Sequence, residues 1–325
     1  METLATKYRP HSFAEIVGQP TIVSVLSRQI ATNTFKSAYL FVGGMGLGKT
    51  STARLLAKEI NHGEGSPIEI DAASNSGIDN VRALISNVQQ SSLDSDYTIV
   101  IVDEVQSFSK AAWDVMLKTI EEPPSNTIFI FCTTNPEKIP GTIMSRVQRF
   151  DFKKISYNEI TDRLEFILNE EVIKDYDRAA LERIAVLADG YMRTAITLLD
   201  KCISYGDVTL SNVEKVLDLV SYDDLFDIVE SLVDKNSEKA LSVVSKLQTL
   251  NFPIIDNLLT FLINCEKYKR THDISVSTIP STYKDRIKDI DYMPYIERLF
   301  RYRQLVLTND AKTLINLFIL EMCKE

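Results

Sequence analysis

The sequence predicts an α/β fold with a parallel sheet in residues 1–155 and helices alone in the rest of the chain. Two observations lead to this prediction. Short apolar runs alternate with amphipathic helical patterns up to residue 155, and strand patterns end there. Such alternation is typical of a parallel sheet with helices on both faces, which binds its ligands at the carboxyl ends of its strands.

Five short segments of the first part have the length and composition of buried strands. They are Ala38–Val42, Pro67–Asp71, Thr98–Val102, Thr127–Cys132 and Val147–Phe152. Helical patterns lie between them at Thr50–Asn61, Ile78–Gln90 and Lys110–Glu121. The third helix should end before Pro123, because a proline disfavours helix in the residue that precedes it.

The pattern beyond residue 155 is helical. Ser156 and Glu159 form a capping box that opens one helix, and Gly190 is a typical stop for the next. A second capping box, Ser211–Glu214, is expected to begin the final helical region. We therefore predict three domains, which are an α/β domain at 1–155, a small helical domain at 156–208 and an all-α domain at 209–325.

The net charge of −9 at first argues against nucleic acid as a partner, but its distribution matters more than its total. Residues 1–155 hold 15 Lys or Arg and 16 Asp or Glu, whereas the remainder holds 21 and 29. The acidity thus belongs to the helical part. The near-neutral first part could carry a local basic face.

Other features exclude some classes of protein. No apolar run approaches the ~18 residues of a membrane span, and the N-terminus lacks an apolar signal-peptide core. A cytoplasmic protein without a membrane partner is therefore expected. The four cysteines lie at least 58 residues apart and form no C-x-x-C pair. This spacing indicates buried free thiols rather than a zinc ribbon or a disulfide framework.

The most specific motif is the octet GGMGLGKT, which fits the phosphate-binding pattern G-x-x-x-x-G-K-[ST]. It lies between a predicted strand and a predicted helix, as that interpretation requires. Loop N–H groups would hold phosphates, Lys49 would reach the β- and γ-phosphates, and the Thr50 hydroxyl would bind Mg²⁺. The alternative is a glycine-rich turn that happens to end in Lys-Thr. The expected nucleotide contacts are Gly43, Gly44, Met45, Gly46, Leu47, Gly48, Lys49, Thr50 and Ser51.

Two further strand ends carry polar residues. The run Thr98–Val102 is followed by Asp103, which could hold Mg²⁺, and by Glu104, which could polarise the water that attacks the γ-phosphate. Two acids after an apolar run are also common at ordinary strand ends, but here they follow the octet in the same predicted sheet. Thr133 ends the next strand and could orient that water, although alone it marks only a strand that leaves for a loop.

Several segments together carry a family resemblance. They are Lys7–Pro10, Ile16–Gln19, Glu69–Ser74, Asp103–Val105, Leu117–Pro124 and Ser145–Arg146. With the octet, they resemble the AAA+ ATPase subunits of DNA sliding-clamp loaders, namely the bacterial gamma/tau subunit of DNA polymerase III and, next, the small subunits of replication factor C. The resemblance is dense over residues 1–200 and covers the rest only as a helical region of suitable length. It implies an AAA+ P-loop NTPase domain, a helical lid domain and a C-terminal collar domain.

The resemblance also implies roles that the local patterns do not assign. Tyr8, Arg9, Pro10 and Val17 match the segment that packs on the adenine base. Thr133 matches the sensor 1 position. Arg193 matches the sensor 2 arginine, which contacts the γ-phosphate of its own subunit, and Arg146 matches an arginine finger that acts in trans on the ATP of a neighbour. From the residues alone, a surface salt bridge is the alternative for either arginine.

Three departures from the family pattern matter. Asn61–Ser66 replaces the four-cysteine zinc module of gamma/tau subunits, so no zinc is expected. Val147 replaces the cysteine after the finger arginine, which should leave the finger unchanged. The chain ends where tau subunits continue into further domains, so a minimal loader subunit is expected. The intact octet favours an active ATPase over the stator-type relative with a degraded loop.

The resemblance places DNA contacts at Asn75, Ser76, Arg82 and Lys138. The first two are neutral where relatives are often basic, which weakens the electrostatic share of binding, and backbone contacts of this kind read no sequence. Arg82 and Lys138 could equally be ordinary solvated charges. Phe108 lies where relatives touch the clamp, and it could equally belong to the core.

These observations predict an ATPase subunit of a clamp loader, which opens a sliding clamp and loads it onto primer–template DNA. The expected cofactors are ATP and Mg²⁺, and the expected partners are other loader subunits in a ring of five, the clamp and DNA. One alternative is an AAA+ DNA motor of the helicase type, although the strand signals of a winged-helix domain are missing. Another is a stator subunit that binds nucleotide without hydrolysing it.

Overall fold

The computed structural model describes residues 2–90, 96–124, 126–248, 254–273, 277–306 and 310–324. The chain divides into two compact units. The first unit comprises Met1–Arg163 and Ala188–Thr197, and the second comprises Leu164–Leu187 and Leu198–Glu325. Because two helices are shared between the units, this division does not test the three predicted domains, which stay a prediction.

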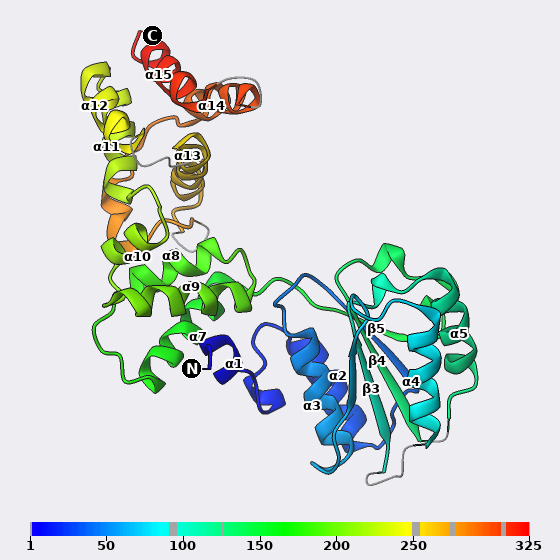
Figure 1. The fold of residues 1–325 in the computed structure, drawn as a ribbon. Coiled ribbons are helices and arrows are strands. Elements are labelled where there is room, and N and C mark those ends of the chain that lie inside the picture. Colours follow the sequence, from blue (N-terminus) through cyan, green and yellow to red (C-terminus); the bar gives the residue numbers. More distant parts are fainter. Residues whose placement is uncertain are drawn as a thin grey trace. The chain divides into compact units, whose positions relative to one another are not determined.

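The first unit is built on one parallel sheet, so the predicted fold class is confirmed (Figure 1). The sheet has the order β2-β3-β4-β1-β5, and all four neighbouring pairs are parallel. The strands are β1 (Ala38–Val42), β2 (Ile68–Asp71), β3 (Thr98–Asp103), β4 (Thr127–Thr133) and β5 (Gln148–Asp151). The order places the carboxyl ends of β3, β4 and β1 side by side.

The central strands explain why their sequences are apolar throughout. Every residue of β1 and β4 is buried, since helices cover both faces of the sheet. One face carries Leu40, Val100 and Phe129, and the opposite face carries Tyr39, Ile101 and Ile130. The edge strand β2 is only partly buried, in alternation.

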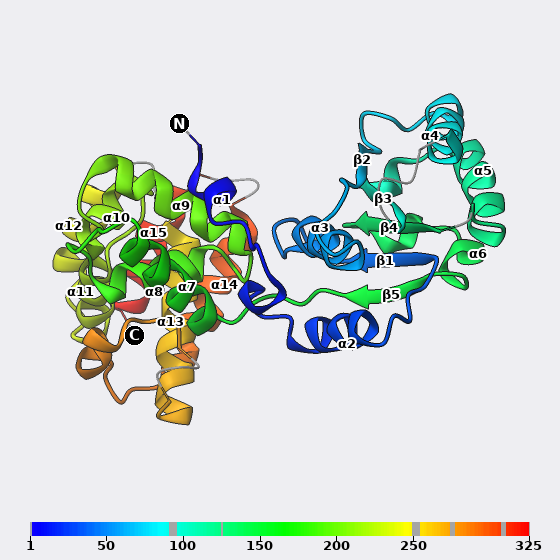
Figure 2. The ribbon, with the colours of Figure 1, turned by 90° about the horizontal axis from the view of Figure 1, so that it is seen from below.

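Helices cover the two faces of the sheet in two layers (Figures 1 and 2). α2 and α3 pack on the face of Tyr39, and α4 and α5 pack on the face of Leu40. The sequence patterns did not predict α2, which begins with a proline at its first turn. The helices of this unit are α1 (Leu4–Lys7), α2 (Pro20–Ala31), α3 (Lys49–Ile60), α4 (Ile78–Gln90), α5 (Lys110–Glu121) and α6 (Gly141–Met144).

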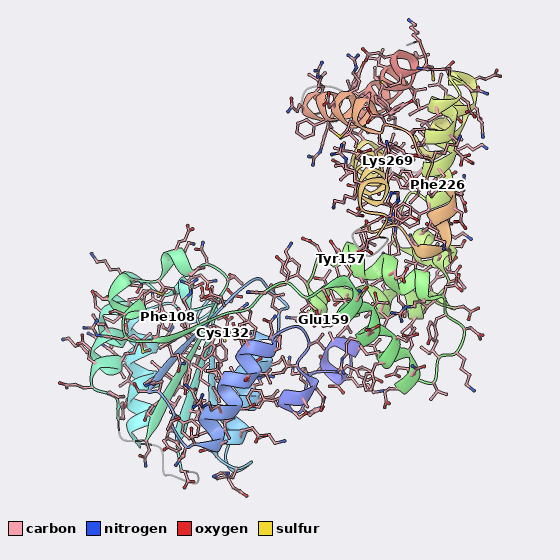
Figure 3. All side chains as sticks on the ribbon, turned by 180° about the vertical axis from the view of Figure 1, so that it is seen from behind. Phe108, Cys132, Tyr157, Glu159, Phe226 and Lys269 are labelled. Atoms are coloured by element: carbon pink, nitrogen blue, oxygen red, sulfur yellow. The ribbon has the colours of Figure 1, made fainter. Side chains whose placement is uncertain are left out.

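The capping predictions had opposite outcomes. The capping box before α7 (Tyr157–Glu170) is confirmed, because the Glu159 N–H donates to Ser156 Oγ and the Ser156 N–H donates to Glu159 Oε2 at 3.1 Å. Figure 3 labels Tyr157 and Glu159 at this helix start. The box predicted at Ser211–Glu214 is wrong.

The helix α10 (Leu210–Val216) begins one residue before Ser211, and its N-cap is Thr209, whose side chain accepts from the Asn212 N–H. Glu214 cannot reach back to cap this helix because its carboxylate is buried. It accepts instead from the Tyr222 N–H at 3.1 Å. The carboxylate of Glu214, the fifth residue of this helix, therefore bonds within the core and takes no part in the cap.

The described part of the second unit is helical apart from an isolated bridge between Tyr176 and Val208. Its core includes Phe226 (labelled in Figure 3), whose ring contacts Phe261 edge-on at 4.7 Å between centroids. α7 and α9 (Met192–Tyr205) are shared with the first unit. The further helices are α8 (Arg178–Leu187), α10, α11 (Tyr222–Val233), α12 (Ser237–Gln248), α13 (Ile254–Thr271), α14 (Met293–Leu305) and α15 (Ala311–Met322).

The cysteines match their prediction as free thiols, and all but Cys323, which is half-buried, lie in the interior. Figure 3 labels Cys132 on β4 in the first unit. Burial raises the pKa of the Cys132 thiol well above its usual value. In the part of the chain that the structure describes, no helix combines the length and apolar character of a membrane span.

Candidate nucleotide-binding site

The octet forms a loop between the end of β1 and the start of α3, as predicted. Gly46 has φ +85° and Gly48 has φ +95°, values in the left-handed region that side chains disfavour. Gly48 is the N-cap residue of α3, so α3 starts at Lys49 with its free N–H groups directed toward the loop. Such a helix start favours an anionic group.

The loop is held from outside by the segment that opens α9. A Cβ atom on Gly44 would lie 2.4 Å from Cε1 of Tyr191, and one on Gly46 would lie 2.8 Å from Cβ of Arg193. The Arg193 N–H also donates to the Gly46 carbonyl at 3.4 Å. Both glycines are therefore needed for close packing, which the motif pattern itself does not require.

Lys49 is buried, with 5% of its surface exposed. Its Nζ donates to the carbonyl oxygens of Gly43 at 2.8 Å and Gly44 at 2.9 Å, so its amine is satisfied by its own loop. Burial lowers the pKa of Lys49, and the nearby Cys132, Glu104 and Asp103 act in the opposite direction. A phosphate would replace the two carbonyls as the partner of this amine.

Thr50 and Asp103 meet at the carboxyl end of β3. Thr50 Oγ1 donates to Asp103 Oδ2 at 2.6 Å, and the Glu104 N–H donates to Asp103 Oδ1 at 3.0 Å. A hydroxyl and a carboxylate beside a phosphate-binding loop are the hard oxygen ligands that Mg²⁺ takes together with waters and substrate phosphates. The donor set fits this ion. Within the described residues, no group of three His, Cys, Asp or Glu side chains has metal-binding geometry, and the expected absence of zinc stays a prediction.

Glu104 has φ +48°, an unusual value for a residue other than glycine. Its Oε2 accepts from Gln106 Nε2 and, at 3.1 Å, from Thr134 Oγ1. Gln106 Oε1 in turn accepts from Thr133 Oγ1 at 2.6 Å. The residues after β3 and those at the end of β4 thus form one hydrogen-bonded network. Glu104 and Thr133 were predicted, whereas Gln106 and Thr134 were not.

The loop opens onto a cavity of about 490 Å³ in the first unit, a volume within the usual range for small-molecule sites. Met45–Ser51, Asp103, Glu104 and Arg193 line it, as do Tyr8, Arg9, Pro10 and Val17 of the N-terminal segment. The structure therefore brings most of the predicted nucleotide-contacting residues together around one cavity. Gly43 and Gly44 follow β1 and are not among the lining residues, and Thr133 is connected to the lining residue Glu104 through Gln106.

Arg163 on α7 also lines the cavity and was missed from the sequence. Its Nη2 donates to the Tyr8 carbonyl at 3.1 Å, and burial lowers its pKa. It ties the N-terminal segment to α7 over 155 residues of sequence. A contact of this kind leaves no local pattern that could have predicted it.

Arg146 follows α6 and is not among the described residues that line the cavity. It forms a half-exposed ion pair with Glu121 of α5 at 2.7 Å and donates to the Thr142 carbonyl at 2.8 Å. The Arg146 side chain thus lies on the surface beside α5 and α6. Its predicted role toward the nucleotide of a neighbouring subunit stays a prediction.

The residues predicted for DNA lie at helix starts and on the surface. Asn75 donates to the Asp71 carbonyl, and the Ser76 carbonyl accepts from the Ser109 N–H. Arg82 on α4 is exposed beside Asp79, and Lys138 is exposed after β4. Their role stays a prediction.

Phe108, labelled in Figure 3, is buried and packs edge-on against Trp113 at 5.5 Å between ring centroids. In this chain it is a core residue. The contact predicted at Phe108 therefore does not correspond to an exposed side chain.

The fold and the loop define a P-loop nucleotide-binding protein of the AAA+ class. The solved structure of the Thermotoga maritima RuvB Holliday junction branch migration motor is similar, with a TM-score of 0.56 over 70% of this chain and 79% of that one. The two share 18% of their residues, so this likeness concerns the fold alone.

The chain belongs to the DNA polymerase III gamma/tau family of clamp-loader subunits. It is 32% identical to the gamma subunit of Buchnera aphidicola subsp. Baizongia pistaciae over 98% of this chain and 96% of the relative. It is 38% identical to the tau subunit of Bacillus subtilis over 76% of this chain. Family models match residues 60–156 ("DNA polymerase III, delta subunit") and 159–208 ("DNA polymerase III clamp loader subunit, ATPase lid domain").

The tau relatives are longer proteins. The chain spans 48% of the Bacillus subtilis subunit and 42% of the Salmonella typhimurium subunit, to which it is 37% identical.

Proposed function

We propose that this chain is an ATPase subunit of a sliding-clamp loader, which works in the cytoplasm and uses ATP binding and hydrolysis to open a clamp and load it onto primer–template DNA. The observation that carries the proposal is the cavity, because it gathers the loop, Asp103, Glu104 and Arg193 in one unit. Family membership supports the same function.

In this proposal the nucleotide lies along the cavity. Tyr8, Arg9, Pro10 and Val17 surround the adenine, and the N–H groups of Gly43–Ser51 hold the phosphates. Lys49 leaves the carbonyls of Gly43 and Gly44 and binds the β- and γ-phosphates.

Thr50 and Asp103 are the residues that would hold Mg²⁺, with water between Asp103 and the ion. When bound, the ion neutralises charge on the phosphate oxygens. To hold the ion, the Thr50 hydroxyl would give up its hydrogen bond to Asp103 Oδ2.

Glu104 accepts a hydrogen bond from the attacking water and orients it in line with the γ-phosphorus, while Thr133 helps to fix the water position. The water oxygen forms a bond to phosphorus as the bond to the β,γ-bridging oxygen breaks, a proton of the water passes to the Glu104 carboxylate, and ADP leaves with the electron pair of the broken bond. Arg193 stabilises the γ-phosphate from within the same chain. The Tyr191–Arg193 segment packs against the loop at Gly44 and Gly46 and so holds Arg193 beside the phosphates.

Arg146 completes the site of the neighbouring subunit in a ring of loader subunits, which we take to be pentameric. Its ion pair with Glu121 must open for this, at a small cost for a half-exposed pair. Primer–template DNA, bound in part by Asn75, Ser76, Arg82 and Lys138, aligns the subunits and thereby triggers hydrolysis and release of the clamp.

The test is ATP turnover of the purified chain, alone and with its partner subunits, with and without primed DNA and candidate clamps, together with the native mass of the complex. The proposal expects little turnover by the lone chain and strong stimulation in the assembly, lost in Lys49→Ala and Glu104→Gln. A stator would keep full turnover of the assembly with these changes in this subunit only. A DNA motor would unwind or translocate DNA without any clamp.

A further inference from the structure

Gln106 lies between two predicted catalytic positions and belongs to neither motif. It follows β3 in the short helical turn Val105–Ser107, and its amide reaches across to the end of β4. Its Nε2 donates to Glu104 Oε2 and, at 3.1 Å, to Thr134 Oγ1, while its Oε1 accepts from Thr133 Oγ1 at 2.6 Å. Both ends of this amide are therefore in use.

The partners fix the direction of the amide. The Glu104 carboxylate only accepts hydrogen bonds, so the NH₂ group and not the carbonyl of Gln106 must face it. The carbonyl is thereby directed to Thr133, whose hydroxyl accepts from the Asn135 N–H at 3.0 Å. The Thr133 hydroxyl thus donates its hydrogen bond to Gln106 Oε1.

Thr133 itself is fully buried, with 0% of its surface exposed, and it does not line the cavity. Its contact with the reacting groups runs through Gln106 to Glu104. A shift of the β4 end would therefore move the Glu104 carboxylate in part through this amide, which makes Gln106 a physical link between the two strands beside the direct bond from Thr134 Oγ1 to Glu104 Oε2 at 3.1 Å.

We propose that Gln106 is a positioning residue for ATP hydrolysis, which holds the Glu104 carboxylate in place and couples it to Thr133. This inference rests on the proposed ATPase function. It assigns Thr133 an indirect role, exerted through Gln106 rather than by contact with nucleotide.

The experiment uses the assembled complex, purified through a tag on this chain with all other subunits unaltered. Gln106→Met keeps the length of the side chain and removes both hydrogen-bonding ends. Gln106→Glu keeps an acceptor for Thr133 and loses the donors to Glu104. Both are expected to lower kcat by about 10- to 100-fold, the effect of losing one hydrogen bond to a charged group, with KM for ATP and the Kd of a fluorescent ATP analogue within about twofold of the parent.

A matched control is Gln29→Met. The amide of Gln29 is also used at both ends, donating to Gln148 at 2.8 Å and accepting from Tyr39 at 3.0 Å, but it lies on α2 away from the cavity lining. Its loss should leave kcat unchanged. Equal loss of kcat in this control would overturn the inference, since any partly buried amide with two partners would then have the same effect.

A double-mutant cycle with Thr133→Val tests the coupling. If Thr133 acts through Gln106, the kcat of the double variant Thr133→Val/Gln106→Met is about equal to that of the single variant with the lower kcat. Three results would each overturn the inference. In the first, the losses of kcat in the two single variants multiply in the double variant. In the second, kcat is unchanged in Gln106→Met, and in the third, nucleotide affinity falls together with kcat. Glu104→Gln is measured alongside. Full turnover in Glu104→Gln rejects the proposed ATPase function itself. Loss of turnover in Glu104→Gln together with normal turnover in Gln106→Met rejects this inference alone.

Discussion

Thr50 Oγ1 lies 2.6 Å from Asp103 Oδ2, although the two residues are 53 positions apart in the sequence. The first turn of α3 supplies the Thr50 hydroxyl, and the carboxyl end of β3 supplies the Asp103 carboxylate. The contact joins the phosphate-binding loop to the acidic strand end, and it exists because β3 lies two strands from β1 with its end at the same edge of the sheet.

This contact predicts that Thr50 acts mainly through a metal ion. Thr50→Val removes the hydroxyl and should weaken Mg²⁺-dependent ATP binding by about 10- to 100-fold, as for other lost hydroxyl contacts to a charged centre. Binding in the presence of EDTA should change little. Titration of a fluorescent ATP analogue with and without Mg²⁺ measures both. Thr50→Ser is the matched control and should bind as the parent does; equal loss with EDTA would argue against the metal role.

The close approach of Tyr191 to Gly44 predicts that a side chain at position 44 is destabilising and that a smaller residue at position 191 restores stability. Gly44→Ala places a methyl group 2.4 Å from the Tyr191 ring and should lower stability by about 1–3 kcal/mol, with weaker nucleotide binding. Tyr191→Ser in the same chain should restore much of both. Thermal unfolding and nucleotide titration are the measurements. Gly141→Ala, where the added atom meets nothing within 4 Å, is the control; failure of the rescue would place the defect in the loop itself.

Arg146 is predicted to act only in the assembly. Arg146→Ala should keep the ATP affinity of the chain and lose DNA- and clamp-stimulated turnover, by up to ~10³-fold or more for an arginine finger. The comparison variant is Arg149→Ala, which removes an arginine that pairs on the surface with Asp151 at 2.6 Å and should keep its stimulation. Retained stimulation in Arg146→Ala would reject the trans role.

Glu214 predicts a pH effect on stability. Burial raises its pKa to about 7, against the smaller opposing effects of the Tyr222 N–H and Arg183. The folded chain therefore binds this proton more tightly than the unfolded chain does. The resulting stabilisation is complete below about pH 4.5 and is lost as the pH rises through 7.

Glu214→Gln keeps a neutral side chain at every pH. It should raise the free energy of unfolding at pH 8 by about 1–3 kcal/mol and change it little near pH 5. Urea denaturation at the two pH values is the measurement. Glu297→Gln, at an exposed position of α14, should have no such pH dependence. A variant less stable than the parent at pH 8 would contradict the assignment.

The sheet could be predicted closely because its centre is buried on both faces. Such strands are continuous apolar runs, and β1 was placed at its observed bounds. α2 was missed because Ile22 and Leu26 are its buried residues, which leaves only a narrow apolar stripe on the helix. The capping box at Ser211 was wrong because a Ser-x-x-Glu pattern does not reveal that the glutamate belongs to the core.

Prediction of the site had a similar limit. The loop and the acidic strand end have local patterns, since phosphate and metal chemistry require fixed residue types at fixed spacing. Gln106 and Arg163 have none, because each acts on a group that another element supplies, Thr133 for one and the Tyr8 carbonyl for the other. Only the folded chain reveals such pairs.

In the proposed assembly, the separation of Arg146 from the cavity gives each subunit a polarity. A subunit that offers an arginine at one surface and receives one at another joins its neighbours head to tail, so the contact is heterologous and not self-complementary. An open row of such chains always has one complete site fewer than it has members. The terminal subunits are then unequal, one with a site that lacks its arginine and the other with an arginine that has no site.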